Sequence, residues 1–273
     1  MADAPGFYTD GQAYDRLMGR WSRAAGQIFL DWLSLPKELD WLDVGCGTGA
    51  FTQLLLERCG PNRMSGIDPS ADQIAFARAR SGTSRVDFRV GDAQSLPFED
   101  DVFDAVVMAL VITFLADPAK ALAEMSRVTR SGGTVATYMW DMTGGGFTQQ
   151  PLRDAMEAMG VTPGASPGVE HSRLDALNTF FETAGLEDVS VRTIEIQLAF
   201  ADFDDYWASE TGFANPTVKP LLALPPREIE RLRASLRERL PTDGNGRIAY
   251  MAWANAIKGC VPGQGSKKET ANV

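Results

Sequence analysis

Three glycines at alternate positions, Gly45, Gly47 and Gly49, follow a short apolar run that begins at Trp41. Glycine permits positive φ angles and lets a ligand lie against bare backbone. The apolar spacing after Gly49 predicts a helix, whose first N–H groups and positive dipole end favour a polar ligand. The stretch therefore predicts a strand, a tight turn and a helix, which suit a nucleotide-like ligand at the carboxyl end of a parallel strand.

The glycine pattern alone fits more than one cofactor. Gly45, Gly47 and Ala50 also satisfy the dinucleotide fingerprint with its permitted final alanine. Asp43 favours a different ligand, because a carboxylate two residues before the first glycine would repel a pyrophosphate but hold a cationic amino group. A turn that merely packs a strand against a helix is the structural alternative.

Residues 43–49, Asp-Val-Gly-Cys-Gly-Thr-Gly, resemble motif I of the class I S-adenosylmethionine-dependent methyltransferases. In that family the acidic residue and the glycine backbone surround the amino-acid end of the cofactor. The resemblance is to the type 11, menaquinone- and ubiquinone-biosynthesis-like small-molecule enzymes, and it is most specific over residues 43–114. It implies a Rossmann-like α/β fold with a seven-stranded, mostly parallel sheet, an antiparallel last strand, helices on both faces and helical lid insertions.

A second carboxylate, Asp68, ends the predicted strand 63–67. It lies about 20 residues beyond the glycine turn, where a doubly wound sheet places the acid that hydrogen-bonds ribose hydroxyls. A helix cap is the alternative role for Asp68. Pro69 separates it from the following helix, which favours ribose binding.

A third carboxylate, Asp92, follows the predicted strand 86–90. In the resembled family this segment binds adenine, which implies that Asp92 accepts from the exocyclic amine and that the Ala93 N–H reaches the ring. An Asx turn at Asp92 is the plain alternative. The resemblance also places Ala109 and Leu110, after the apolar strand 103–108, beside the sulfonium. The Asn/Asp-Pro-Pro-Tyr/Phe element of some amino- and DNA-directed methyltransferases is absent there.

The N-terminal stretch 12–33 has overlapping apolar faces and predicts a helix. Its residues 14–22 resemble the segment that closes over cofactor and substrate in small-molecule methyltransferases, and a helix that only covers the sheet edge is the alternative. The full predicted cofactor set is Asp43, Gly45, Cys46, Gly47, Gly49, Asp68, Pro69, Asp92, Ala93, Ala109, Leu110, Tyr14, Met18 and Arg23.

Two insertions interrupt what we expect to be a single domain over residues 1–273. Residues 141–171 are rich in glycine and proline and hold a helical piece, and residues 199–243 are rich in aromatic side chains. Both are predicted lids or walls of a substrate site. A helical subdomain with its own aromatic core is the alternative for the second insertion, and residues 263–273 read as a polar tail.

Methyl transfer is an in-line displacement at a sulfonium carbon, so the protein mainly aligns donor and acceptor about 3 Å apart and excludes water. A base is needed only when the acceptor must lose a proton. His171, the only histidine, Tyr138 and Asp141 are the candidates. An exposed loop position is the simpler interpretation of His171, and strand-end packing is the alternative for Tyr138.

The composition of the chain limits which partners, metal sites and cellular compartments are expected. The chain of 273 residues has a formal charge of −10, which argues against a nucleic-acid partner. Three cysteines without metal spacing predict neither a disulfide framework nor a metal site, and favour the cytoplasm. Neither a secretory signal nor a membrane span is expected.

We predict S-adenosylmethionine-dependent methyl transfer to a small molecule. A nicotinamide-dependent oxidoreductase and a non-catalytic cofactor-binding module are the alternatives, and the oligomeric state is open.

Overall fold

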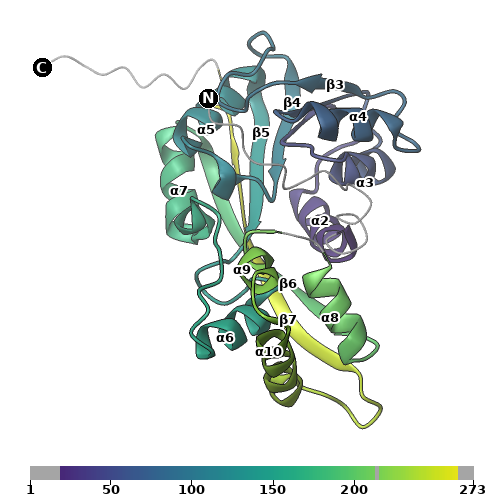
Figure 1. The fold of residues 1–273 in the computed structure, drawn as a ribbon. Coiled ribbons are helices and arrows are strands. Elements are labelled where there is room, and N and C mark those ends of the chain that lie inside the picture. Colours follow the sequence, from purple (N-terminus) through teal and green to yellow (C-terminus); the bar gives the residue numbers. More distant parts are fainter. Residues whose placement is uncertain (1–18, 213–214, 264–273) are drawn as a thin grey trace, which may run out of the picture.

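A computed structural model describes residues 19–212 and 215–263 and shows one seven-stranded sheet (Figure 1). The strand order is β3-β2-β1-β4-β5-β7-β6. The strands are β1 Asp40–Val44, β2 Arg63–Asp68, β3 Asp87–Val90, β4 Phe103–Ala109, β5 Thr129–Trp140, β6 Glu187–Phe200 and β7 Ile248–Cys260. β7 runs antiparallel to both β5 and β6, whereas the pairs from β3 to β5 are parallel. The predicted sheet is confirmed.

Helices cover both faces of the sheet. They are α2 Gly19–Leu33, α3 Ala50–Cys59, α4 Ala71–Ala79, α5 Pro118–Val128, α6 Gln150–Ala158, α7 Leu174–Thr183, α8 Phe203–Thr211, α9 Val218–Leu222 and α10 Pro226–Arg239, with 3₁₀ turns η1 Ile112–Phe114 and η2 Val169–Ser172. In the described ranges no helix has both the length and the apolar character needed to cross a bilayer.

Successive side chains along the central strands point to opposite faces of the sheet, so the buried side chains form two layers. Val107 joins Phe29 of α2 in one cluster, while Val106 joins Leu122 of α5 and Phe181 of α7 in the other. Figure 1 shows α2, α3 and α4 on one side of the sheet and α5 and α7 on the other. Burial on both faces explains the nearly continuous apolar sequence of β4.

The fifth strand begins earlier than its sequence predicts. We expected a helix end at residues 131–133 and a strand from Thr134, but β5 starts at Thr129. Thr129 already pairs with Phe103 of β4, and a bulge separates this pair from the next. Gly132, at φ 76°, bends the strand there and donates its N–H to the Val261 carbonyl. The glycines therefore mark a bulge inside the strand.

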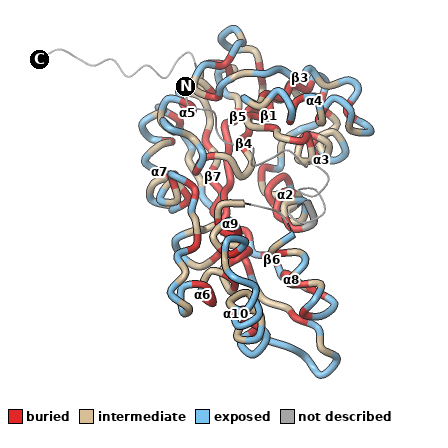
Figure 2. Tube along the Cα trace, viewed as in Figure 1, coloured by how far each residue is buried: buried red, intermediate tan, exposed pale blue. Residues whose placement is uncertain are grey.

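The last two strands extend beyond the others as a long hairpin, paired from Glu187 to Phe200 on β6. Helices α8, α9 and α10 connect their far ends, and α6 packs against α10. We call α6, α8, α9, α10 and the far ends of β6 and β7 the arm (Figure 1). Buried residues continue from the sheet into the arm (Figure 2). Rings of Phe200, Tyr206 and Tyr250 pack there with centroids 5.1–6.2 Å apart.

A charged network fixes the amino ends of the central strands. The Asp40 side chain, 8% exposed, accepts from Asn62 Nδ2 at 2.8 Å, Arg63 Nη2 at 2.6 Å and Arg130 Nη2 at 3.1 Å. Hydrogen bonding to Arg63 is the main reason why the pKa of Asp40 lies far below its ordinary value. The network ties β1 to β2 and β5 at the edge opposite the glycine turn.

We expect Asp40→Ala to lower the free energy of unfolding by about 2 kcal/mol at pH 7, less than for a fully buried pair because Arg63 and Arg130 are partly exposed. The lowered pKa means that this contribution is present above about pH 4 and is lost as the pH falls. Urea unfolding at pH 7 and pH 3 measures both effects. Asp87→Ala, which breaks an exposed pair with Arg89, should cost less than about 0.5 kcal/mol. Equal losses in the two variants would contradict this account.

Candidate functional site

The glycine turn leaves β1 between its two parallel neighbours, β2 and β4. Gly45, Gly47 and Gly49 have φ angles of 75°, 52° and 77°, as their sequence predicts. A Cβ on Gly45 would lie 2.5 Å from Val111 Cγ2, whereas nothing lies within 4 Å of the same position on Gly47. Gly45 is thus required by packing, and Gly47 leaves open backbone for a ligand.

The N–H groups of the turn are largely engaged within the protein. Gly45 and Cys46 both donate to the Ile67 carbonyl, at 2.7 and 3.0 Å, and Gly49 donates to the Cys46 carbonyl. The Cys46 side chain packs in an apolar cluster with Phe88, and burial raises the pKa of its thiol. Any contact of Cys46 with a ligand therefore depends on its backbone.

Asp43 is the buried carboxylate of the site, with 1% of its surface exposed. Its Oδ2 accepts from Thr52 Oγ1 at 2.6 Å, while Oδ1 is buried without a hydrogen bond. Burial raises the pKa of Asp43 to about 7, and the nearby Asp68 charge adds to the rise. An unsatisfied buried oxygen is costly, so a cationic donor at this position would be bound strongly.

Asp68 sits at the end of β2 and faces the turn. Its Oδ2 accepts from the Gly47 N–H at 3.0 Å and its Oδ1 from the Ser70 N–H at 2.9 Å. Each carboxylate oxygen retains a lone pair for a ligand hydroxyl. The cap of α4 is Ser70, whose hydroxyl accepts from the Gln73 N–H, so Asp68 does not cap this helix. Burial raises the pKa of Asp68, and the two backbone N–H groups oppose that rise.

Asp92 and Ala93 follow β3, at the same edge of the sheet. Asp92 is exposed and its Oδ1 accepts from the Gln94 N–H at 2.9 Å, which is the Asx turn that we considered as the alternative. Its Oδ2 has only a long contact, 3.5 Å, with Gln94 Nε2. Ala93 is 7% exposed. The Asx turn fixes the carboxylate without using all of its acceptor capacity.

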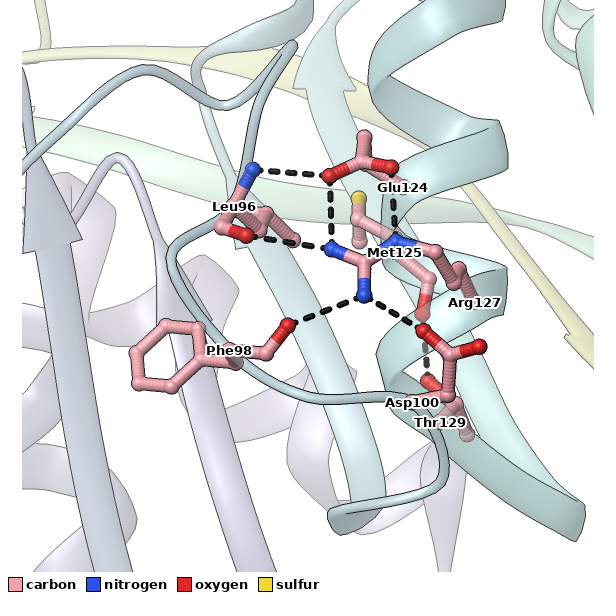
Figure 3. Close-up of polar contacts among 7 residues, drawn as sticks. All are labelled: Leu96, Phe98, Asp100, Glu124, Met125, Arg127 and Thr129. Carbon is pink, nitrogen blue, oxygen red and sulfur yellow. Dashed lines mark hydrogen bonds and ion pairs between the residues drawn. The ribbon is translucent and has the colours of Figure 1, made fainter.

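Arg127 of α5 holds the loop that follows Ala93 (Figure 3). It donates to the carbonyls of Leu96 and Phe98 at 3.0 and 2.9 Å. It also pairs with Glu124, which in turn accepts from the Leu96 N–H at 2.8 Å. The pairing raises the pKa of Arg127 and lowers that of Glu124. The role of Arg127 could not be predicted from the sequence, because an Arg three residues after a Glu is typical of an ordinary surface pair.

The carboxyl end of β4 is strained. Leu110 has a φ of 62°, which is rare for a residue with a side chain, and its N–H donates to the Tyr138 carbonyl at 2.9 Å. Ala109 pairs with Tyr138, two positions beyond the pair of Asp43 with Val107. Asp43, Ala109 and Leu110 therefore lie at one edge of the sheet, and backbone strain of this kind gathers at functional sites.

The three candidate bases have different surroundings. Tyr138 is buried, with its ring 4.7 Å from Phe29 and 5.9 Å from Phe51 between centroids. Asp141 accepts from Trp253 Nε1 at 3.1 Å and from the Gly144 N–H at 2.8 Å, so it stabilises a turn. Neither arrangement favours proton transfer.

His171 is half-buried rather than exposed in a loop. Its Nδ1 is buried without a hydrogen bond, and its ring packs edge-on against Phe180 at 5.4 Å. The Gly168 N–H donates to the Thr113 carbonyl, which ties η2 to η1 just after the strained Leu110. His171 is thus more buried than an exposed loop position would be, and its catalytic role stays a prediction.

The N-terminal candidates are only partly visible. Tyr14 and Met18 lie outside the described residues. Arg23 is on the surface of α2, where it pairs with Glu57 of α3 and is 45% exposed. The structure thus gives Arg23 a surface ion pair between two helices, and its predicted contact with a cofactor is not tested by it.

Residues 42–137 match a protein family described as "Methyltransferase domain". This part of the chain is therefore similar to methyltransferase domains. The 2-phytyl-1,4-naphtoquinone methyltransferase of Thermosynechococcus vestitus is 36% identical over 45% of this chain and 57% of its own length. The malonyl-[acyl-carrier protein] O-methyltransferase of Pectobacterium atrosepticum is 29% identical over 64% of this chain and 66% of its own length.

The fold of the chain is also similar to that of solved structures. A solved structure of phosphoethanolamine N-methyltransferase 2 from Haemonchus contortus, in complex with S-adenosyl-L-methionine, covers 95% of this chain and 59% of its own, with a TM-score of 0.60 and 17% identity. At that identity the likeness shows the fold. The curated relatives named above are matched over 57% and 66% of their own lengths, and the first match covers less than half of this chain.

We expect Arg127→Ala to free the loop after β3, since it removes donors to two loop carbonyls. Amide hydrogen exchange of residues 94–100 should become roughly tenfold faster or more, as measured by mass spectrometry of peptides. Arg173→Ala, which breaks an exposed pair with Asp175, should leave that exchange unchanged. Unaltered exchange in the Arg127 variant would show that the loop is held by other contacts.

Proposed function

We propose that this chain transfers the methyl group of S-adenosylmethionine to a small-molecule acceptor. The observation that carries the proposal is a row of carboxylates, Asp43, Asp68 and Asp92, at or near the carboxyl ends of three neighbouring strands β1, β2 and β3. They lie at the carboxyl edge of a parallel sheet, where open α/β folds bind their ligands. The spacing across adjacent strands suits an extended ligand with an amino group at one end and a base at the other.

The residues present fit this cofactor. The unbonded Asp43 Oδ1 would accept from its ammonium group, and the open face of Gly47 leaves space for its amino-acid portion. Asp68 would accept from the ribose hydroxyls, and Asp92 with the Ala93 N–H would bind adenine. A pyrophosphate beside the buried Asp43 would be repelled, which counts against a nicotinamide cofactor.

When bound, the cofactor supplies an activated methyl group on a sulfonium, so the protein needs no nucleophile of its own. Ala109 and Leu110 at the end of β4 would position that centre. The arm and the segment around η2 lie beyond the carboxyl edge and would enclose the acceptor and exclude water. His171 is the best placed of the three candidate bases, should the acceptor need to lose a proton.

The relatives support a small-molecule acceptor but do not identify it. Several are named as quinone or hydroquinone methyltransferases, which supports a small molecule. Their similarity to this chain covers less than half of it, and the matched family ends at residue 137, before the arm begins. The arm, which is the predicted substrate wall, must therefore be interpreted from its own residues.

We expect S-adenosylmethionine and S-adenosylhomocysteine to bind with dissociation constants on the order of 10 μM, and NADH not to bind. Asp68→Asn keeps the side-chain size but removes charged acceptors, so it should weaken binding roughly tenfold to a hundredfold. Isothermal titration calorimetry gives all three constants.

Asp72→Asn, an exposed position on α4, is the matched control and should bind as the natural chain does. Binding of NADH alone would refute the methyltransferase proposal. Unchanged affinity for S-adenosylmethionine in the Asp68 variant would show that Asp68 does not bind the ribose.

A further inference from the structure

The arm contains a buried carboxyl group that the proposed methyl transfer does not use. Glu210 of α8 is 5% exposed, and among the described residues no Lys, Arg or His pairs with it. Gln149 Nε2 donates to its backbone carbonyl at 2.7 Å. Burial raises the pKa of Glu210 to about 8, and the neighbouring Gln149 amide opposes that rise. A carboxyl group in such surroundings is costly to keep without a positive charge beside it.

Other polar groups lie around Glu210. The Thr148 hydroxyl is buried without a hydrogen bond, and the Tyr206 hydroxyl is buried beside that of Tyr250. Tyr250 donates to the Thr148 carbonyl at 2.8 Å. The charge of Glu210 helps to raise the pKa values of both tyrosines, which places all three side chains close together.

These groups come from separate parts of the chain. Thr148 lies between β5 and α6, Tyr206 and Glu210 belong to α8, and Tyr250 belongs to β7. Packing alone favours apolar side chains at such positions, since each unsatisfied buried polar group weakens the fold. Their convergence instead indicates recognition of a polar ligand.

The cluster lies on the side of the sheet where an acceptor would enter. Tyr138 pairs with Ala109 at the proposed methyl-transfer centre, and Trp140 two residues later pairs with Ala254 of β7. Tyr250 of the cluster is four residues from Ala254 on β7, so the cluster lies beyond the carboxyl end of β5. Phe200 packs against Tyr206 and Tyr250, with ring centroids 5.1 and 5.9 Å away, so aromatic rings surround the carboxyl group. A carboxylate with aromatic neighbours attracts a cation and repels an anion.

We propose that Glu210, with the hydroxyls of Tyr206 and Thr148, binds a protonated amine of the methyl acceptor. The acceptor is then an amine-bearing small molecule, held in the arm with its methylated atom toward the end of β4. This inference rests on the proposed function and names its substrate class. Because Glu210 is nearly closed off from solvent, an amine reaches it when the arm opens, and the bound amine holds the arm closed.

Binding of a cation should release a proton. Near pH 7 the raised pKa leaves most of the Glu210 carboxyl protonated, and a bound ammonium group would make the ionised form the stable one. Within residues 19–212 and 215–263, the other titratable groups that interact with this cluster are Tyr206 on α8, Tyr250 on β7 and Asp154 on α6. Both phenols have raised pKa values and stay neutral, so Glu210 is the source of the proton.

The test uses the full chain saturated with S-adenosylhomocysteine and three probes of similar shape: benzylamine, benzyl alcohol and benzoate. We expect calorimetry at pH 7 to detect binding of benzylamine only, weakened tenfold or more by Glu210→Gln. Titration in two buffers of different ionisation enthalpy should show a released proton that the variant does not release. Glu195→Gln, exposed on β6, is the matched control and should behave as the natural chain does.

The proposal is overturned if benzylamine does not bind, if benzyl alcohol binds equally well, or if Glu210→Gln leaves amine affinity unchanged. Binding of S-adenosylhomocysteine is measured first and reports on the proposed function alone. If that binding fails, the methyltransferase proposal fails, and the amine titration repeated without the cofactor still decides the role of Glu210. Circular dichroism of the variant confirms that it folds.

Discussion

The site depends on the tight packing of Gly45 against the residues that follow β4 and against the end of β2. The Gly45 N–H and that of Cys46 both donate to the Ile67 carbonyl of β2, while Val111 after β4 fills the space that a side chain at Gly45 would need. Three strand ends therefore meet within a few ångströms. This contact brings Asp43 and Asp68 to one edge and leaves the outer face of Gly47 open.

We assign cofactor binding to the sheet and its helices, and acceptor binding to the arm. Carboxylates at or near the carboxyl ends of β1, β2 and β3 suit one extended cofactor. Local backbone N–H groups hold Asp68 and Asp92, and Arg127 of α5 holds the loop after β3. The arm is built on the far ends of β6 and β7 and carries unsatisfied polar groups of its own. In this account the core fixes the methyl donor and the arm selects the acceptor.

The sequence predicts the parts of the site that depend on neighbours along the chain. Positive φ at Gly47 and the strand end at Asp68 are local, and the apolar run of β4 indicates a central strand. Arg127 and Glu210 were beyond such analysis, because their roles follow from contacts between segments that are far apart. The strain at Leu110 left no signal, since nothing in its residue type predicts a left-handed conformation.

A crystal structure of the chain with S-adenosylhomocysteine tests the central claim most directly. The account predicts the amino group of the ligand beside Asp43, the ribose hydroxyls on Asp68 and the adenine against Ala93, with the sulfur facing Leu110. The contradicting result is a ligand bound elsewhere, or one whose amino-acid portion lies away from Gly47 and the carboxyl end of β1.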